Sequence, residues 1–256
     1  MLLVIDVGNT NTKVGLCDDA GVRVSWTLTT RREQTADEYG LFIEALLRSN
    51  GIEASQVSAV AISNVVPPVQ QALEWMSEKY FKVTPLTVTG ANSPLPLDVD
   101  EPREVGPDRI VSCVGALAIY GAPVIVVDLG TATRFDCVDG RGAFVGGAIA
   151  PGLGIAMDAL SARAARLFRV EMTRPESAIG RNTTTNIQSG MIFGFAGLVD
   201  GIVERMKPEL GGTPTVVATG GQAPLIAPVS RTIQHVNGDL KLDGLRLAWL
   251  GTRSDR

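Results

Sequence analysis

Short apolar runs separated by glycine-rich turns make up the start of the chain. Residues 2–6 are apolar up to a closing carboxylate, which predicts a buried strand. Turn clusters at 8–11 and 18–21 bound two further extended segments, over 12–16 and 22–29. The chain is therefore expected to open with a meander of strands.

Helical and extended patterns alternate over the rest of the first half. A capping-box pattern at 35–38 predicts a helix as far as Gly51. Pro67 and Pro68 suit the first turn of a second helix, which continues to Phe81. The remaining elements expected here are strands over 57–63 and 85–89 and a helix over 110–118.

The second half of the chain repeats the opening pattern. Residues 124–128 form an apolar run that ends in an aspartate followed by glycine and hydroxyl residues, as residues 4–6 do. Two such units about half a chain apart indicate an internal duplication. We expect an α/β fold of two duplicated lobes, residues 1–121 and 122–256, with a cleft between them. The other elements expected in the second lobe are strands over 135–138, 144–149 and 214–219 and helices over 156–167, 186–206 and 240–250.

Charge and hydropathy narrow the class of protein. The 256 residues include 23 Lys and Arg against 27 Asp and Glu, a net charge of −4, whereas a non-specific nucleic-acid binder needs a basic surface. The uncharged stretch 110–127 is long enough to suggest a membrane helix, but Gly121 and Pro123 interrupt it. No signal-like segment is recognised at the start. We therefore expect a cytoplasmic protein with no nucleic-acid or membrane partner.

The cysteines and the single histidine carry no predicted chemistry. Cys17, Cys113 and Cys137 are widely spaced and form no C-x-x-C pair. That spacing favours neither a disulfide framework nor a zinc site, so we expect small buried side chains. His235 lies in a polar stretch and is expected to be a solvated loop residue.

Asp6 and Asp128 each end a predicted buried strand, where an unpaired carboxylate would be costly. One interpretation is a turn aspartate that accepts hydrogen bonds from its own backbone. The other is a pair of ligands for a hydrated cation, which prefers oxygen donors. Because the two aspartates occupy matching turns of a duplication, the second interpretation is favoured.

The residues after both aspartates suit a phosphate group. Gly8 allows close approach of a backbone, the following amide and hydroxyl residues donate hydrogen bonds, and Lys13 adds a positive charge. The spacing is not that of a P-loop, which opens a helix. Together with residues 130–133 of the second half, the turn predicts a two-sided phosphate clamp.

Gly106, Pro107, Asp108 and Arg109 lie where a helix is predicted to begin. Asp108 in the first turn is either a capping residue in a favourable helix dipole or a general base beside a hydroxyl. Arg109 is either a surface residue or a fork that binds a carboxylate. The glycines and the proline of 146–152 indicate a sharp turn or a bare backbone against a ligand.

These motifs resemble the two phosphate motifs of the actin, sugar-kinase and heat-shock-chaperone ATPase superfamily, whose lobes are of the ribonuclease H-like type and enclose a nucleotide. Within it, the chain is similar to type III pantothenate kinases, whose marks D-x-G-N-T-x-x-K, G-x-D-R, D-x-G-T-A-T, G-G-x-I-x-P-G and G-x-N-T occur in order. They lie at 6–13, 106–109, 128–133, 146–152 and 180–183, and residues 219–221 resemble the adenosine motif.

The resemblance implies ATP-dependent phosphorylation of pantothenate to 4'-phosphopantothenate, the first step toward coenzyme A. It implies Mg²⁺, held through water by Asp6, and a monovalent cation, K⁺ or NH₄⁺, bound by Asp128. Asp108 matches the general base. The ATP contacts implied are Asp6, Val7, Gly8, Asn9, Thr10, Asn11, Thr12, Lys13 and Thr131, and the substrate contacts are Gly106, Pro107, Asp108, Arg109 and Thr183.

The resemblance also implies a homodimer with shared active sites, in which Thr183 reaches the substrate of the neighbouring subunit. The predicted helix 186–206 carries a broad apolar face that suits either the core of its own lobe or the two-fold interface. The apolar positions at helical spacing are Ile187, Met191, Phe195, Leu198, Val199 and Ile202.

Two positions depart from the family pattern. Arg134 stands where the family has the second threonine of D-x-G-T-A-T-T-F-D, and it either adds a phosphate contact or blocks one. Val99 stands where a tyrosine is frequent, which removes a substrate contact. Two other functions compete with the kinase: a non-catalytic relative acting as a regulatory or transcription accessory factor, and another kinase or phosphatase of the superfamily. Lys13, Asp108 and Asp128 favour the enzyme.

Overall fold

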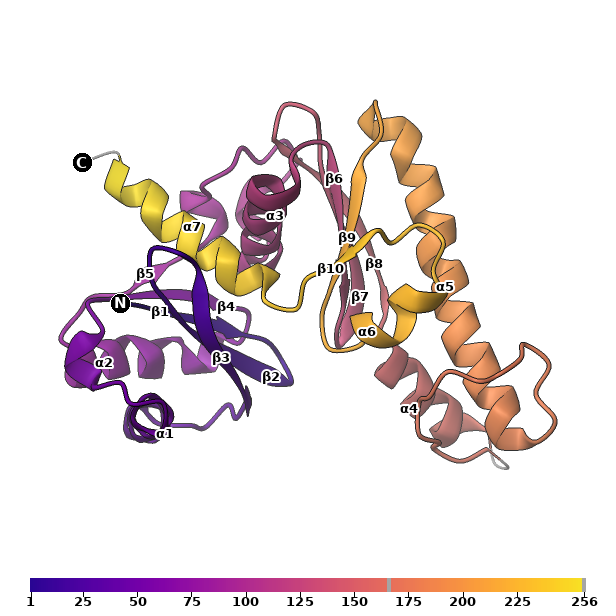
Figure 1. Cartoon of the computed structure of the whole chain (residues 1–256), viewed down its shortest axis with the longest axis horizontal. Coiled ribbons are helices and arrows are strands. Elements are labelled where there is room, and N and C mark those ends of the chain that lie inside the picture. Colours follow the sequence, from indigo (N-terminus) through magenta and orange to yellow (C-terminus); the bar gives the residue numbers. More distant parts are fainter. Residues whose placement is uncertain (165–166, 255–256) are drawn as a thin grey trace. The chain divides into compact units, whose positions relative to one another are not determined.

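The computed structural model describes residues 1–164 and 167–254 and divides into two compact units. Unit 1 comprises Met1–Gly115 together with Asp239–Arg256, and unit 2 comprises Ala116–Gly238 (Figure 1). Each unit contains one five-stranded sheet. The expected α/β fold with two lobes is therefore confirmed.

The sheet of unit 1 has the strand order β3-β2-β1-β4-β5. Strands β1 and β2 are antiparallel, as are β2 and β3, whereas β4 is parallel to β1 and β5 is parallel to β4. The meander expected at the start of the chain is thus confirmed. The strands are β1 (Leu2–Val7), β2 (Asn11–Cys17), β3 (Val22–Thr29), β4 (Ala59–Asn64) and β5 (Leu86–Thr87).

Helices α1 (Ala36–Ser49) and α2 (Gln70–Phe81) pack against this sheet. The predicted capping box is present at the start of α1, where Thr35 and Glu38 satisfy each other's backbone N–H groups. The helix expected from Pro67 begins instead with a 3-10 turn, Pro67–Val69. The buried core joins strand and helix residues, among them Leu3, Ile5, Ile62, Ile43, Leu47, Leu73 and Met76.

The last helix of the chain, α7 (Leu240–Ser254), belongs to unit 1. It packs against β1, β2 and β4, and its start also lies against α3 (Pro107–Tyr120). That approach needs glycine, because a Cβ added to Gly244 would lie 1.8 Å from the carbonyl oxygen of Val111. The division at residues 121 and 122 that the sequence pattern predicts therefore differs from the observed units, since α7 returns to the first sheet.

The sheet of unit 2 repeats the topology of the first, with the order β10-β9-β6-β7-β8. Strands β6, β7 and β8 form an antiparallel meander, and β9 is parallel to β6, as β4 is to β1. The internal duplication seen in the sequence is therefore a duplication of topology. The strands are β6 (Val124–Leu129), β7 (Ala132–Val138), β8 (Phe144–Pro151), β9 (Thr215–Thr219) and β10 (His235–Val236).

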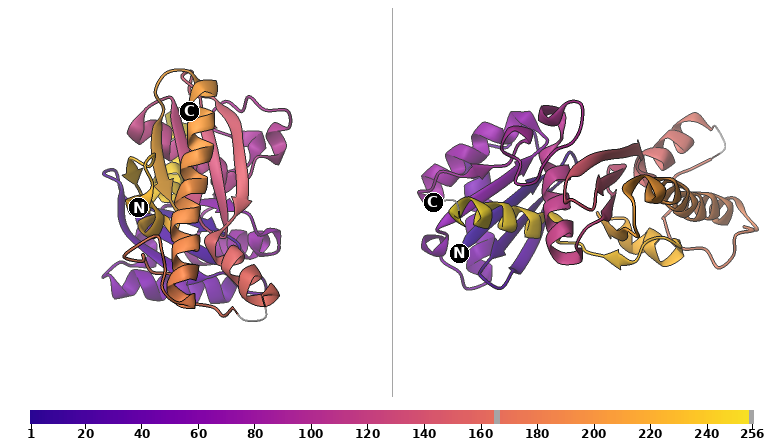
Figure 2. Two further views of the ribbon diagram at one scale, coloured as in Figure 1. Left: turned by 90° about the vertical axis from the view of Figure 1, so that its right-hand side faces the viewer. Right: turned by 90° about the horizontal axis from the view of Figure 1, so that it is seen from above.

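Helix α5 (Thr183–Leu210) lies along the sheet of unit 2 (Figure 2, left). Its expected apolar positions belong to the core of this unit or pack against it, among them Ile187, Met191 and Val199. Among the described residues α5 is the one helix whose length and composition would allow it to cross a membrane, and several of its apolar side chains pack in the core of unit 2. It begins three residues earlier than expected because Asn182 caps it, accepting from the Thr185 N–H at 2.9 Å.

Several smaller elements differ from the sequence predictions. The helix expected over 156–167 is α4 (Leu153–Arg163); residues 165–166 of that prediction lie outside the described residues. His235 is exposed as expected, but it forms the short edge strand β10 and stacks on Tyr120, with ring centroids 4.9 Å apart. All three cysteines are buried, as expected, and none forms a disulfide in the part of the chain that the structure describes. The remaining helices are α6 (Ala223–Ile226) and the 3-10 turns Ala54–Gln56, Gly90–Asn92, Pro102–Glu104 and Ala227–Val229.

Candidate functional site

The turn between β1 and β2 presents a short polar loop. The N–H of Gly8 donates to the carbonyl oxygen of Asn11 at 3.0 Å, which closes the turn. Residues 9–11 are exposed, whereas Thr12 is buried and its hydroxyl oxygen lies 2.9 Å from that of Thr30. The predicted nucleotide contacts are thus split between exposed side chains at the tip and the interior side chains of Val7 and Thr12.

Asp6 lies at the end of β1 with a buried carboxylate. Its Oδ1 accepts from the hydroxyl of Ser63 at 2.9 Å, and Ser63 is the register partner of Asp6 on β4. Its Oδ2 lies 3.7 Å from Nζ of Lys241 in α7, a distance beyond a direct hydrogen bond. Unit 1 therefore holds this carboxylate in place through residues far apart in the sequence.

Lys13 is the register partner of Asp6 on β2, yet its ammonium pairs elsewhere. Its Nζ lies 2.8 Å from Oδ1 of Asp239, which also accepts from the hydroxyl of Ser25 at 3.1 Å. Lys13 is 29% and Asp239 42% exposed, and ion pairs in contact with water contribute only about 0–1 kcal/mol. Lys13 can exchange this partner for an anionic ligand at little cost in free energy.

Asp108 lies in the first turn of α3 and is buried. A Cβ added to Gly106 would lie 2.8 Å from its Oδ1, so a glycine is needed at 106 for the carboxylate to fold back over the helix start. The N–H groups of Arg109 and Ile110 donate to the carbonyl oxygen of Gly106 at 3.0 and 3.2 Å. An acidic side chain in the first turn is a favourable arrangement for the helix dipole.

The turn between β6 and β7 is also closed by a glycine N–H, but it is one residue shorter than the first turn. The N–H of Gly130 donates to the carbonyl oxygen of Ala132 at 3.1 Å, Thr131 is exposed, and Thr133 is buried. Asp128 is the second-last residue of the buried strand β6, as Asp6 is of β1. The two turns share an exposed tip followed by a buried threonine on the second strand, Thr12 in one and Thr133 in the other.

Asp128 differs from Asp6 in its charged partner. Its register partner on β7 is Arg134, and the guanidinium Nη2 of Arg134 pairs directly with Oδ2 of Asp128. The side chains are only 3% exposed for Asp128 and 17% for Arg134. A buried pair of this kind is strongly destabilised when one partner is removed, because the other charge is left uncompensated.

Two glycines approach the second hairpin closely, one at the Asp128 carboxylate and one at the turn. Gly220 has a φ of +91°, and a Cβ placed on it would lie 2.6 Å from Oδ1 of Asp128. Gly152 lies under the turn, since a Cβ there would lie 2.2 Å from the carbonyl oxygen of Thr131. Residues of the predicted adenosine motif and of the predicted 146–152 turn therefore contact the second hairpin by close backbone approach.

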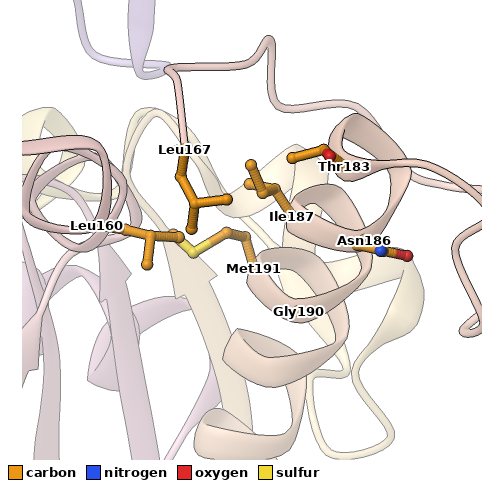
Figure 3. A pocket seen from close by; sticks show the side chains of 7 residues that line it. All are labelled: Leu160, Leu167, Thr183, Asn186, Ile187, Gly190 and Met191. Carbon is orange, nitrogen blue, oxygen red and sulfur yellow. The ribbon is translucent and has the colours of Figure 1, made fainter. Parts of the chain in front are cut away.

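Thr183 is the first residue of α5 and borders a pocket of about 430 Å³ in unit 2 (Figure 3). The inner lining is apolar and includes Leu160, Leu167 and Met191, whereas Thr183 and Asn186 supply its polar groups. The N-cap of α5 holds Thr183 at this edge. The pocket suits a ligand or a side chain with an apolar body and a polar end.

Within unit 1 the structure joins Asp6 to Ser63 and Lys241 and Lys13 to Asp239, and within unit 2 it joins Asp128 to Arg134 and Gly220. Lys241 and Asp239 were not singled out from the sequence. No recognisable motif surrounds these two residues at the start of the last helix. The packing of α7 in unit 1 is what brings them to the first hairpin.

Comparison with known proteins adds independent information. The family model described as type III pantothenate kinase matches residues 2–205. A type III pantothenate kinase of Anaeromyxobacter sp. (strain Fw109-5) is 50% identical over 248 residues, which cover 96% of this chain and 98% of that protein.

Solved structures of lower identity share the fold. A protein from Campylobacter jejuni assigned to the Baf family of transcriptional activators aligns with a TM-score of 0.63 at 18% identity, over 98% of this chain and 99% of that chain. The activator of 2-hydroxyisocaproyl-CoA dehydratase from Clostridium difficile, with bound ADPNP, aligns with a TM-score of 0.55 at 12% identity, over 99% and 96%. These likenesses concern the fold alone, which is that of the actin-like ATPases and sugar kinases.

Proposed function

Because the chain belongs to the type III pantothenate kinase family, we propose that it transfers the γ-phosphoryl group of ATP to the primary hydroxyl of pantothenate. The product is 4'-phosphopantothenate, and the reaction is the first step toward coenzyme A. The observation that carries the proposal is the buried carboxylate of Asp108 at the start of α3, in a chain that matches the family over most of its length.

Asp108 is proposed as the general base. As the hydroxyl oxygen of pantothenate bonds to the γ-phosphorus, the carboxylate accepts the hydroxyl proton and ADP leaves. Phosphoryl transfer depends mainly on positioning and charge neutralisation, so Asp108 orients the hydroxyl more than it activates it. Gly106 and Pro107 shape the helix start, and the guanidinium of Arg109 suits the carboxylate of pantothenate.

ATP binding is proposed to involve both hairpin turns. Residues 9–11 and the backbone of Gly8 donate hydrogen bonds to phosphate oxygens, and Lys13 leaves Asp239 to add its charge. Thr131 at the tip of the β6–β7 turn supplies a further hydroxyl. The side chains of Val7 and Thr12 are buried and shape the first turn. We therefore propose that these two residues contact ATP through their backbone atoms.

Mg²⁺ fits the residues around Asp6. This ion keeps most of its waters and binds one or two carboxylates together with substrate phosphates, so a cage of several acidic residues is not needed. Among the described residues no cluster of three or more metal-binding side chains occurs. The buried carboxylate of Asp6, oriented by Ser63, suits contact through water. Bound Mg²⁺ would neutralise charge on the phosphates.

A monovalent cation at Asp128, K⁺ or NH₄⁺, does not fit in the same way. The carboxylate that would bind it already pairs with the guanidinium of Arg134, and glycines enclose its other oxygen. We therefore derive no step through this ion.

The competing function is that of a non-catalytic accessory factor. The likeness to a Baf-family protein from Campylobacter jejuni concerns the fold alone. The presence of Asp108, Lys13 and Asp128 supports the kinase, and the net charge of −4 is unfavourable for direct nucleic-acid binding. We place the reaction in the cytoplasm, where ATP is available.

The function is tested by supplying the purified full chain with ATP, Mg²⁺ and pantothenate. We expect ADP release that depends on pantothenate, together with a product heavier by one phosphoryl group in mass spectrometry. A matched reaction without pantothenate measures background ATP hydrolysis. No turnover at millimolar ATP in any salt tested would contradict the proposal and favour the accessory factor.

We further propose that the chain acts as a homodimer with shared active sites. Part of the apolar face of α5 is buried in the core of unit 2, whereas Phe195, Leu198 and Ile202 are only partly buried there. Helix α5 also carries Gly190, Gly194 and Gly197, and a Cβ placed on any of the three would meet no described atom within 4 Å. Small residues let a second helix approach closely, and Ile149, Phe168 and Ile179 are also exposed in this unit.

Complementation between two weakened variants tests the shared site. Asp108→Ala and Thr183→Arg are each expected to lose activity. In a mixed dimer one site carries both lesions and the other carries neither, so co-refolding restores activity above that of either variant. If the subunits demonstrably mix and activity stays at the parental level, Thr183 does not act across the interface.

A further inference from the structure

The pair of Asp128 and Arg134 is built into the second hairpin. The two residues face each other across β6 and β7 in the antiparallel register, so their side chains point to the same face of the sheet. The guanidinium Nη2 contacts Oδ2 of the carboxylate, and both side chains are largely removed from solvent. A neighbouring strand position thus supplies a fixed positive charge to this aspartate.

The residues around Asp128 and Arg134 also favour a positive charge at this place. Asp136 lies two residues beyond Arg134 on the same face of β7 and is fully buried. On its other side, Oδ1 of Asp128 faces Gly220, whose backbone leaves no space for a Cβ. A buried carboxylate in such a place is stable only with a compensating cation.

We propose that Arg134 is the resident cation of the Asp128 site, so that the kinase needs no added K⁺ or NH₄⁺. The inference rests on the proposed kinase function and specifies its cofactor requirement. The arginine guanidinium stays charged at any working pH and presents a planar fork that suits a carboxylate. Being covalently attached, it occupies the site at any salt concentration, whereas a bound ion must be recruited from solution.

The salt dependence of the unmodified enzyme tests this directly. Pantothenate-dependent ADP release is measured in KCl, NH₄Cl and choline chloride at a constant ionic strength of about 0.15 M. Choline is too large to replace a bare cation beside a buried carboxylate. We expect rates that agree within about twofold in the three salts, because the charge at Asp128 is supplied by the chain. Strong activation by K⁺ or NH₄⁺ would overturn the proposal.

Arg134→Thr removes the resident cation and restores the hydroxyl that the family pattern has at this position. We expect its rate in choline chloride to fall at least about tenfold and to recover in KCl or NH₄Cl, since Asp128 then binds a free ion. Arg141→Thr is the matched control, because Arg141 is an exposed arginine that pairs with an aspartate, Asp139, at the next turn. The control is expected to behave as the unmodified enzyme in every salt.

Thermal unfolding gives a readout that does not depend on turnover. Ions that bind only the folded state raise the Tm by mass action. Relative to choline, K⁺ should raise the Tm of Arg134→Thr and leave that of the unmodified chain unchanged. If Arg134→Thr shows no K⁺ response in either Tm or rate while remaining folded, Arg134 is not a substitute for a cation.

The two proposals fail in different ways. If the chain has no kinase activity in any salt, the proposed function is lost, and the Tm comparison still decides whether Arg134 occupies a cation site. If the chain is active but depends on K⁺, the kinase stands and the role of Arg134 is refuted.

Discussion

The hairpins β1–β2 and β6–β7 are both antiparallel strand pairs, but their charged side chains are paired differently. In each, an aspartate at the end of the buried strand faces a basic residue on the next strand: Lys13 opposite Asp6 and Arg134 opposite Asp128. In the first hairpin the basic residue pairs with Asp239 instead of its strand neighbour. In the second it pairs with the strand neighbour directly.

The charged partners of the two hairpins come from different parts of the chain. In unit 1, Lys241 of α7 lies near Asp6, and Asp239, just before α7, pairs with Lys13. The pair of Lys13 and Asp239 is partly exposed to solvent. In unit 2 the carboxylate and the arginine neutralise each other out of solvent. We infer that the first hairpin keeps a cation available for a ligand, whereas the second uses its cation to stabilise the site itself.

The largest loss of turnover is expected at Asp108, which lies outside both hairpins. Substitutions in the hairpins are expected to have smaller effects than this one. Asp108→Asn removes the proton acceptor and keeps the shape of the side chain, so turnover should fall about 10²–10⁴-fold with the fold retained. Steady-state kinetics with circular dichroism as a check on folding measure this. Asp100→Asn, an exposed aspartate ahead of α3, is the control, and near-normal turnover of Asp108→Asn would reduce Asp108 to a helix cap.

Alanine at Gly220 should damage the second hairpin more than alanine at Gly8 damages the first. Gly220 has a φ of +91°, and its Cβ would lie 2.6 Å from the Asp128 carboxylate. Gly8 has no such φ, and its Cβ would lie 3.0 Å from the Asn11 carbonyl oxygen. Gly220→Ala is therefore expected to lower the free energy of unfolding by about 1–3 kcal/mol and to reduce turnover. Equal effects in denaturant titrations of the two variants would argue against the special backbone at Gly220.

Lys13→Ala separates ATP binding from pantothenate binding. Because the ammonium is assigned to the phosphates, the KM for ATP should rise about tenfold while that for pantothenate stays nearly constant. Lys79→Ala is the matched control, since it breaks an exposed lysine–aspartate pair elsewhere in unit 1. If the KM for ATP and the turnover of Lys13→Ala are unchanged, Lys13 does not contact the nucleotide and serves only as the partner of Asp239.

Asp239→Asn is expected to have the smallest effect and an opposite sign. The amide still accepts from Ser25 but no longer competes for Lys13, whose exposed pair contributes about 0–1 kcal/mol. The KM for ATP should therefore fall by no more than about fivefold. A raised KM, measured beside Lys13→Ala, would mean that Asp239 positions the lysine for the nucleotide rather than withholding it.

Local and repeating features of the fold could be predicted from the sequence. The capping box of Thr35 and Glu38 depends on residues three positions apart. The strands of both meanders follow from short apolar runs between turn residues, because hydrophobic periodicity and turn chemistry act over a few residues. The matching Asp-x-Gly turns identified the duplication, and through the family resemblance they identified the chemistry.

Local patterns along the chain are sufficient for most of the strands and helices, for the two hairpins and for the residue types in their turns. Packing in three dimensions is needed to find that α7 closes unit 1, that Lys241 and Asp239 reach the first hairpin, and that Arg134 pairs with Asp128. Such pairings depend on packing and on strand register between residues distant along the chain, which local propensity does not encode. For Arg134 the pattern left open whether it contacts a phosphate or blocks one, and the cross-strand register brings it to the Asp128 carboxylate.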